Sequence, residues 1–163
     1  MRPMMRVPFI AALAMAFALF AGAAHAQTMT QYGGSGVPVT DPAIFSQSIA
    51  LEISRDRMEP LRRTMGQMLG TEQLNTEIEV SITQMERWIG DAPSQEVTKL
   101  EDVSLAGTLR RIYYLNTFAG RLLFTRYDFV RTPDGWALTG VTFGSTWNSV
   151  NANPLTPGWT VTQ

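Results

Sequence analysis

The chain contains no cysteine, and its only histidine, His25, lies among the first 26 residues. Those residues carry the pattern of a cleaved export signal, so the remaining chain would contain neither residue type. Such a chain cannot build a catalytic triad with histidine, a cysteine–histidine site, a zinc site with these ligands, a histidine-ligated haem or an iron–sulfur cluster. Disulfides are excluded too, so stability has to come from a packed core. We expect no cofactor and no metal.

Lysine is almost absent as well, because Lys99 is the only one. Two of the 13 basic residues lie in the leader, which leaves 11 against 14 acidic residues and a formal net charge of −3. Proteins that bind nucleic acid or anionic lipid do so with clustered lysine and arginine. We therefore expect no nucleic-acid partner.

The leader itself has the three parts of a signal peptide. Arg2 and Arg6 precede a long uncharged apolar run, and Ala24-His25-Ala26 is a small-x-small cleavage site. The apolar run is nearly long enough to span a bilayer, so a membrane anchor is the alternative. The polar stretch that follows favours a cut after Ala26, and a lipoprotein would need a cysteine there. We predict a periplasmic or secreted protein without a stable membrane anchor after cleavage.

The 137 residues that remain have the size of one domain. Residues 27–40 are rich in glycine and polar residues, which predicts a flexible lead-in. Residues 41–147 read as a single α+β domain, with helices to about residue 90 and a sheet from about residue 96. Residues 148–163 are rich in asparagine and proline and predict an irregular tail, or one loosely docked through Trp159.

Three apolar stripes at helical spacing predict three helices in the first half of this domain. Pro42 opens the first, which runs to the mid-fifties, and Pro60 opens the second, which ends at Gly70. The third starts at Thr71 or its neighbours and ends before Gly90. Several of the stripe residues are methionines, which are core filler in one interpretation and an adaptable binding surface in the other.

Arginines and acidic residues interleave between residues 52 and 63. A mixed run of this kind favours a solvated surface. A clamp for phosphate or carboxylate, formed by Arg55, Arg57, Arg62 and Arg63, is the alternative.

From Glu96 the apolar period changes to two, which predicts strands. The segment KLEDVSL is a weak strand or an extended segment, whereas LRRIYYLNTF and RLLFTRYDFV are strong strands joined at Ala119-Gly120. Pairing Phe118 with Arg121 across this turn gathers the aromatic side chains on one face. On the other face it sets Arg111 opposite Asp128, as an exposed ion pair.

A second hairpin, at the segment RTPDGW, pairs Arg131 with Trp136. In the strand that follows, WALTGVTFG, the alternation of apolar and polar residues breaks at Thr139-Gly140. One extra residue there, a β-bulge with positive φ at the glycine, would keep Leu138 and Val141 on the same face. We therefore predict an α+β fold in which N-terminal helices pack on a strongly bent antiparallel β-meander with a bulge at Thr139-Gly140.

This order of elements resembles the cystatin-like or nuclear transport factor 2-like cone over residues 42–147. Residues 108–146, with two aromatic strands, an x-D-G-W turn and a closing strand, also resemble a recurrent half of small exported bacterial proteins of unknown function. The resemblance implies isomerases, hydrolases, dehydratases, binding modules or dimerisation modules, and the fold does not select among them.

An isomerase- or hydrolase-type enzyme of this family would work inside the cone with an acidic or histidine base and a tyrosine. Our pairing places no carboxylate on the concave face. A base would have to come from a helix, with four candidates: Glu52, Asp56, Glu79 and Glu86.

A small-molecule-binding cone is the second hypothesis, because pockets are mostly apolar with a few fixed polar groups. Arg110, Tyr114, Thr125 and Tyr127 share the concave face with Asn116 and would suit a small apolar or anionic ligand. The alternative is that the tyrosines fill the core and bond to neighbouring backbone.

The convex face carries Tyr113, Leu115, Leu122 and Phe124, and is too apolar for a fully solvated sheet. Sheet-to-sheet packing against a second copy, or against an envelope protein, would cover it. The sequence thus favours a non-catalytic exported envelope protein, an interaction or dimerisation module, and we assign it no catalytic residue.

Overall fold

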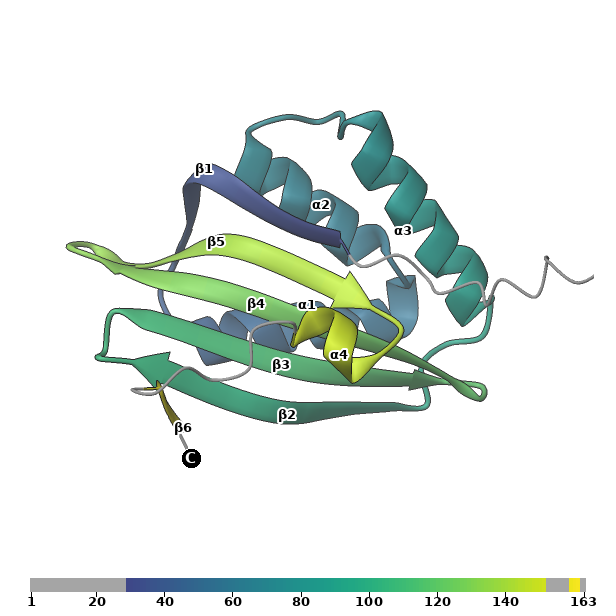
Figure 1. Cartoon of the computed structure of the whole chain (residues 1–163). Coiled ribbons are helices and arrows are strands. Elements are labelled where there is room, and N and C mark those ends of the chain that lie inside the picture. Colours follow the sequence, from purple (N-terminus) through teal and green to yellow (C-terminus); the bar gives the residue numbers. More distant parts are fainter. Residues whose placement is uncertain (1–28, 152–158, 162–163) are drawn as a thin grey trace, which may run out of the picture.

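A computed structural model of the protein describes residues 29–151 and 159–161 (Figure 1). The predicted signal peptide, residues 1–26, and the cut after Ala26 lie outside the described residues.

Five long antiparallel strands form one sheet in the order β1-β5-β4-β3-β2, and the short β6 pairs with the far edge of β2. The bounds are β1 (Met29–Val39), β2 (Glu96–Leu105), β3 (Leu109–Phe118), β4 (Arg121–Thr132), β5 (Gly135–Gly144) and β6 (Trp159–Val161). Strands β2 to β5 follow one another as a meander, and β1 joins it beside β5 (Figure 1). The α+β prediction is confirmed at this level.

The segment predicted as a flexible lead-in, residues 27–40, contains β1. Its backbone pairs with β5 in two stretches, from Met29↔Phe143 to Tyr32↔Gly140 and from Val37↔Leu138 to Val39↔Trp136. The glycines suggested a linker because glycine has low strand propensity. Here the ladder with β5 overrides propensity, and an irregularity between Tyr32 and Val37 accommodates the Gly-rich part.

Three helices precede the meander: α1 (Pro42–Asp56), α2 (Glu59–Leu69) and α3 (Thr76–Ile89). The Asp41 carboxylate caps α1 by accepting from the backbone N–H of Ala43 at 2.8 Å. Gly70 ends α2 in the left-handed conformation, with φ 63°. The first two helices therefore lie close to where the sequence predicts them.

The third helix begins at Thr76 rather than at Thr71. Asn75 is its N-cap, and its side chain accepts from the N–H of Ile78 at 3.0 Å. Thr71 instead folds back onto α2 through a bond from its N–H to the Gly66 carbonyl at 3.0 Å. Asparagine is as good an N-cap as threonine, so the later cap prevails once the Gly70 turn occupies Thr71.

The predicted strand registers are confirmed. Phe118 pairs with Arg121 and Arg111 with Asp128, and in the next hairpin Arg131 pairs with Trp136. A bulge at Thr139 shifts the register between Phe129↔Leu138 and Asp128↔Gly140.

The sheet is not strongly curled, so the strongly bent meander is wrong. The Thr139 bulge restores the alternation, but Gly140 does not take a positive φ, contrary to the expectation. Strong closure needs bulges repeated across neighbouring strands. Strands β3 and β4 instead pair from Leu109↔Val130 to Phe118↔Arg121 without a register shift, so no bulge bends the centre of the sheet.

The tail predicted as irregular, residues 148–163, includes two regular elements. One helical turn, α4 (Trp147–Val150), is capped by Thr146, and β6 adds to β2. Helices α1–α3 cover one side of the sheet, here called the inner face, and α4 lies on the other side, the outer face (Figure 1).

Two hydrophobic clusters correspond to the two faces. The inner cluster is the main core and joins helix residues such as Ile53, Met65 and Ile82 to Ile112, Phe129 and their neighbours on the sheet. The outer cluster is small and is built from four buried residues: Val103, Tyr113, Phe124 and Val150. The predicted concave face is thus the inner face of the sheet, and the predicted convex face is its outer face.

Candidate functional site

The four residues predicted to bind a ligand all lie on the inner face. Tyr114 pairs across the strands with Thr125, and the rings of Tyr114 and Tyr127 meet edge to face with centroids 6.3 Å apart. Arg110 lies on the same face of β3, nearer the β2 edge. With Asp102 and Asn116 they form what we call the inner polar cluster: Asp102, Arg110, Tyr114, Asn116, Thr125 and Tyr127.

Asp102 of β2 corrects the expectation that this face holds no carboxylate. Its side chain is 3% exposed and accepts two bonds from Arg110, from Nε at 2.8 Å and from Nη2 at 2.7 Å. Lys99 lies 3.8 Å away on the exposed side. The bonds to Asp102 raise the pKa of Arg110. A carboxylate held in a bidentate pair like this is occupied as an acceptor.

The interior end of the cluster is fully buried and incompletely paired. Tyr127 and Thr125 are fully buried, and their hydroxyls lie beside each other, so that Thr125 partly offsets the effect of burial on the pKa of Tyr127. Asn116 donates to the Ala50 carbonyl of α1 at 2.8 Å, but its amide oxygen is without a hydrogen-bond partner among the described residues. Unpaired buried polar atoms are uncommon and call for an explanation.

Both inner tyrosines are held in the neutral form. Burial raises the pKa of Tyr127 far above its ordinary value. Burial also raises the pKa of Tyr114, partly offset by the nearby Ser46 hydroxyl of α1. Neither phenol is therefore poised to act as a base at neutral pH.

Three of the four helix carboxylates that were candidates for a catalytic base connect helices to one another. Glu52 pairs with Arg63, and Asp56 is exposed. Glu79 and Glu86 of α3 both pair with Arg62 of α2, at 3.2 and 3.7 Å.

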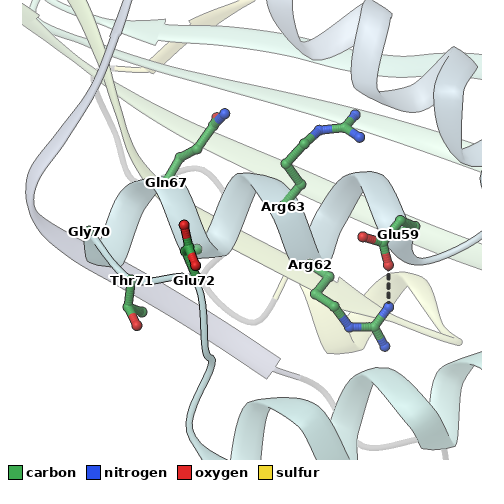
Figure 2. A pocket seen from close by; sticks show the side chains of 8 residues that line it. Glu59, Arg62, Arg63, Gln67, Gly70, Thr71 and Glu72 are labelled. Carbon is green, nitrogen blue, oxygen red and sulfur yellow. Dashed lines mark hydrogen bonds and ion pairs between the residues drawn. The ribbon is translucent and has the colours of Figure 1, made fainter.

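A depression of about 470 Å³ lies beside α2, lined by Glu59, Arg62, Arg63, Gly66, Gln67, Gly70, Thr71 and Glu72 (Figure 2). Arg62 and Arg63 project in different directions from α2, and Arg62 is bonded to Glu59 at 2.6 Å (Figure 2). Although burial alone would lower it, the surrounding carboxylates raise the pKa of Arg62. Since both arginines already have carboxylate partners, they do not form an open clamp for an anion.

The predicted interface residues divide into a covered and an uncovered part. The indole of Trp147 covers Tyr113 and Phe124, with ring centroids 4.9 and 6.2 Å apart, so both are buried. Leu115 is half-buried and Leu122 is 38% exposed. We call Leu115, Leu122 and the partly exposed Trp147 the outer apolar patch.

The ion pair between Arg111 and Asp128 corrects a second expectation, because it is largely buried rather than exposed. Arg111 Nε donates to Asp128 at 2.6 Å, and Arg126 approaches the same carboxylate at 3.1 Å. Arg126, which is 4% exposed, also donates to the Val150 carbonyl of α4 at 2.6 Å. This face was expected to be exposed to solvent, but α4 packs on it instead.

Two further searches covered residues 29–151 and 159–161. Over these residues, histidine, cysteine, aspartate and glutamate do not gather in a group of three that could hold a metal ion. Over the same part of the chain, the helices are too short or too polar to cross a membrane.

Comparisons with protein-family models, with curated proteins and with solved structures found no match. The α+β architecture stands, and no family is identified. The geometry of the two faces therefore has to carry the functional argument.

Sequence reasoning missed three residues that shape these sites. Asp102 was missed because a register shift between Lys99 and Glu101 hides which face it occupies. Trp147 and Asn151 were assigned to the domain end and the tail, although Thr146 before Trp147 is an N-cap signal.

Proposed function

We propose that the protein is a non-catalytic exported envelope protein that acts by binding another protein or a second copy of itself. The outer apolar patch carries this proposal. Leu122 stands 38% exposed beside the buried Phe124, on a sheet face that short elements cover only in part. Apolar surface of this kind marks interaction sites when it is contiguous.

The state of the polar groups supports a non-catalytic role. Asp102 is occupied by Arg110, the inner tyrosines are neutral and buried, and three of the helix carboxylates are paired with arginine. General acid–base catalysis needs a group that is accessible and near its pKa at working pH. An isomerase- or hydrolase-type reaction is therefore the less favoured function.

Binding of a small molecule at the inner polar cluster is the second candidate. One atom supports it: the Asn116 amide oxygen is buried without a hydrogen-bond partner in the described structure. A polar ligand that reached this oxygen and donated a hydrogen bond would satisfy it. A small molecule retained in a native mass spectrum, and lost in Thr125→Val, would favour this candidate.

Export is part of the proposal and rests on the leader sequence. Fractionation of the source cells, followed by mass analysis of the protein, should find it outside the cytoplasm with Gln27 as its first residue. A cytoplasmic chain that keeps its first 26 residues would refute export.

The interaction surface is tested by placing a charge on it. We expect Leu122→Asp to weaken self-association or partner capture at least tenfold in analytical ultracentrifugation and pull-down, because burying an unpaired carboxylate is costly. Val80→Asp is the matched control, since Val80 is 45% exposed on α3, a different surface.

An unchanged association constant in Leu122→Asp would overturn the outer patch as the binding surface. Equal weakening by Val80→Asp would do so too, because the effect would then not depend on location. Monomers at every concentration, with no captured protein, would refute the interaction function itself.

A further inference from the structure

Strand β1, which lies beside β5 at one edge of the sheet, is divided into two halves (Figure 1). The first half, residues 29–32, and the second half, residues 37–39, each pair with β5. Residues 33–36 lie between them, opposite the single residue Thr139 of β5. We call these four residues, Gly-Gly-Ser-Gly, the hinge.

The second half of β1 is held to its own chain. Val39 is buried, and Val37 packs against the inner cluster. Asp41, which follows β1 almost at once, caps α1. A segment tied in this way to the core and to the first helix opens only with the core itself. The part of β1 that can change its partner is therefore the first half.

The hinge is suited to such a change. It is mostly glycine, the residue with the widest choice of backbone conformations. Fully extended, four residues span about 14 Å, which is enough to carry the first half to a neighbouring chain. In the structure Gly36 has a φ of 69°, and a Cβ there would lie 3.0 Å from the Leu138 carbonyl oxygen. The present position of the first half thus depends on glycine at residue 36.

The edge of β5 also defines what binds to it. Residues 29–32 match this edge in register, from Met29↔Phe143 to Tyr32↔Gly140. The same residues of a second copy would form the same ladder, because their sequence is identical. The free-energy difference between the two arrangements is then limited to the hinge and to the association of two chains.

We propose that two copies of the chain exchange the first half of β1, so that residues 29–32 of each copy pair with β5 of the other. The second halves stay with their own chains. This inference goes beyond the proposed function, because it uses the edge of the sheet and not the outer apolar patch. It makes the dimer an alternative to the closed monomer that is favoured at high protein concentration.

Exchange is tested with introduced cysteines, since the chain has none of its own. Thr30 and Thr142 pair across β1 and β5. One variant carries Thr30→Cys and another Thr142→Cys, and the two folded proteins are mixed at high concentration with glutathione disulfide. A disulfide between residues 30 and 142 then joins the two chains only where β1 of one pairs with β5 of the other.

The matched control uses a ladder without a hinge. Glu96→Cys and Thr117→Cys are mixed in the same way, because Glu96 pairs with Thr117 across β2 and β3. Each yield is divided by that of the variant with both cysteines in one chain, which corrects for how readily each pair forms the bond. We expect at least tenfold more disulfide between chains at residues 30 and 142, rising with concentration. Equal yields would overturn the exchange.

The hinge is tested with Gly36→Ala, compared with Gly120→Ala. Both glycines have positive φ, 69° and 74°, but a Cβ at Gly120 would meet nothing within 4 Å. Alanine at residue 36 strains the closed monomer, so we expect it to raise the yield of the 30–142 disulfide between chains at least fivefold. Gly120→Ala should leave that yield unchanged. Equal yields in the two variants would overturn the role of the hinge.

Leu122→Asp separates this inference from the proposed function. A dimer that persists in this variant, with the 30–142 disulfide between chains, supports the exchange and overturns the outer apolar patch. A dimer that is lost in this variant, with that disulfide at the level of the control, supports the patch and overturns the exchange.

Discussion

The two faces of the sheet are covered in different ways. Helices of 15, 11 and 14 residues lie over the inner face, whereas the outer face has one turn of four residues. The inner face is secured mainly by apolar side chains. On the outer face, a buried carboxylate shared by two arginines stands beside a small apolar cluster. The inner face therefore holds the main core, whereas the outer face is packed over a smaller area.

The largest expected difference between the faces is in the unfolding free energy lost when a phenylalanine of β4 is replaced by alanine. Phe129→Ala removes a fully packed inner ring that meets Phe45 edge to face at 6.4 Å, and should cost about 4 kcal/mol of unfolding free energy. Phe124→Ala, on the outer face beneath Trp147, should cost about 2 kcal/mol, because the short helix α4 can move into the volume that the ring leaves. Urea unfolding measures both, and equal losses would break the comparison.

The ionic groups should show the opposite order. Asp128→Asn leaves Arg111 and Arg126 without their shared carboxylate and should cost about 3 kcal/mol, because removing one partner of a buried pair is strongly destabilising. Asp102→Asn should cost about 2 kcal/mol, because Arg110 stays partly solvated. Chemical denaturation of the two variants would contradict this ranking if Asp102→Asn proved the more costly.

Ionisation of the buried tyrosines at alkaline pH should change folding stability by the smallest amount. The pKa of Tyr127 is raised above its ordinary value of 10.0, so the contribution of this tyrosine to folding stability is constant below pH 10. Above pH 10 it falls by about 1.4 kcal/mol per pH unit per such tyrosine, because only the unfolded chain ionises readily. Tyr127→Phe should reduce this fall. Tyr113→Phe on the outer face should reduce it less, because Arg111 partly offsets the effect of burial on Tyr113.

Urea titrations between pH 8 and pH 11 measure these slopes. An alkaline fall that is unchanged in Tyr127→Phe would show that the inner hydroxyl is not the group that titrates. A greater effect of Tyr113→Phe would show that the outer face is the less accessible of the two.

The sequence predicted the hairpins well because their determinants are local. The Gly120 turn sets the pairing of Phe118 with Arg121, and the broken alternation at Thr139 indicated the bulge. The curvature of the sheet was predicted wrongly, because it depends on how bulges on several strands combine. No single stretch of sequence carries that information.

The candidate site was predicted in part. Tyr114 and Tyr127 were placed on the correct face, since alternation along β3 and β4 decides it. Asp102 could not be placed, because a shift in β2 breaks its alternation. Helix α4 was missed because four residues are too few to show helical periodicity, and because this turn depends on the sheet beneath it for its structure.

The pairing of β1 with β5 has a kinetic consequence. Met29 pairs with Phe143, more than a hundred residues later, whereas each hairpin of the meander closes over a few residues. Contacts between distant parts of a chain form slowly, because a long loop must close first. A chain that emerges N-terminus first therefore keeps β1 unpaired until nearly the whole domain has followed. Until β1 pairs, β5 is an exposed edge of the sheet, with backbone groups free to pair with another chain.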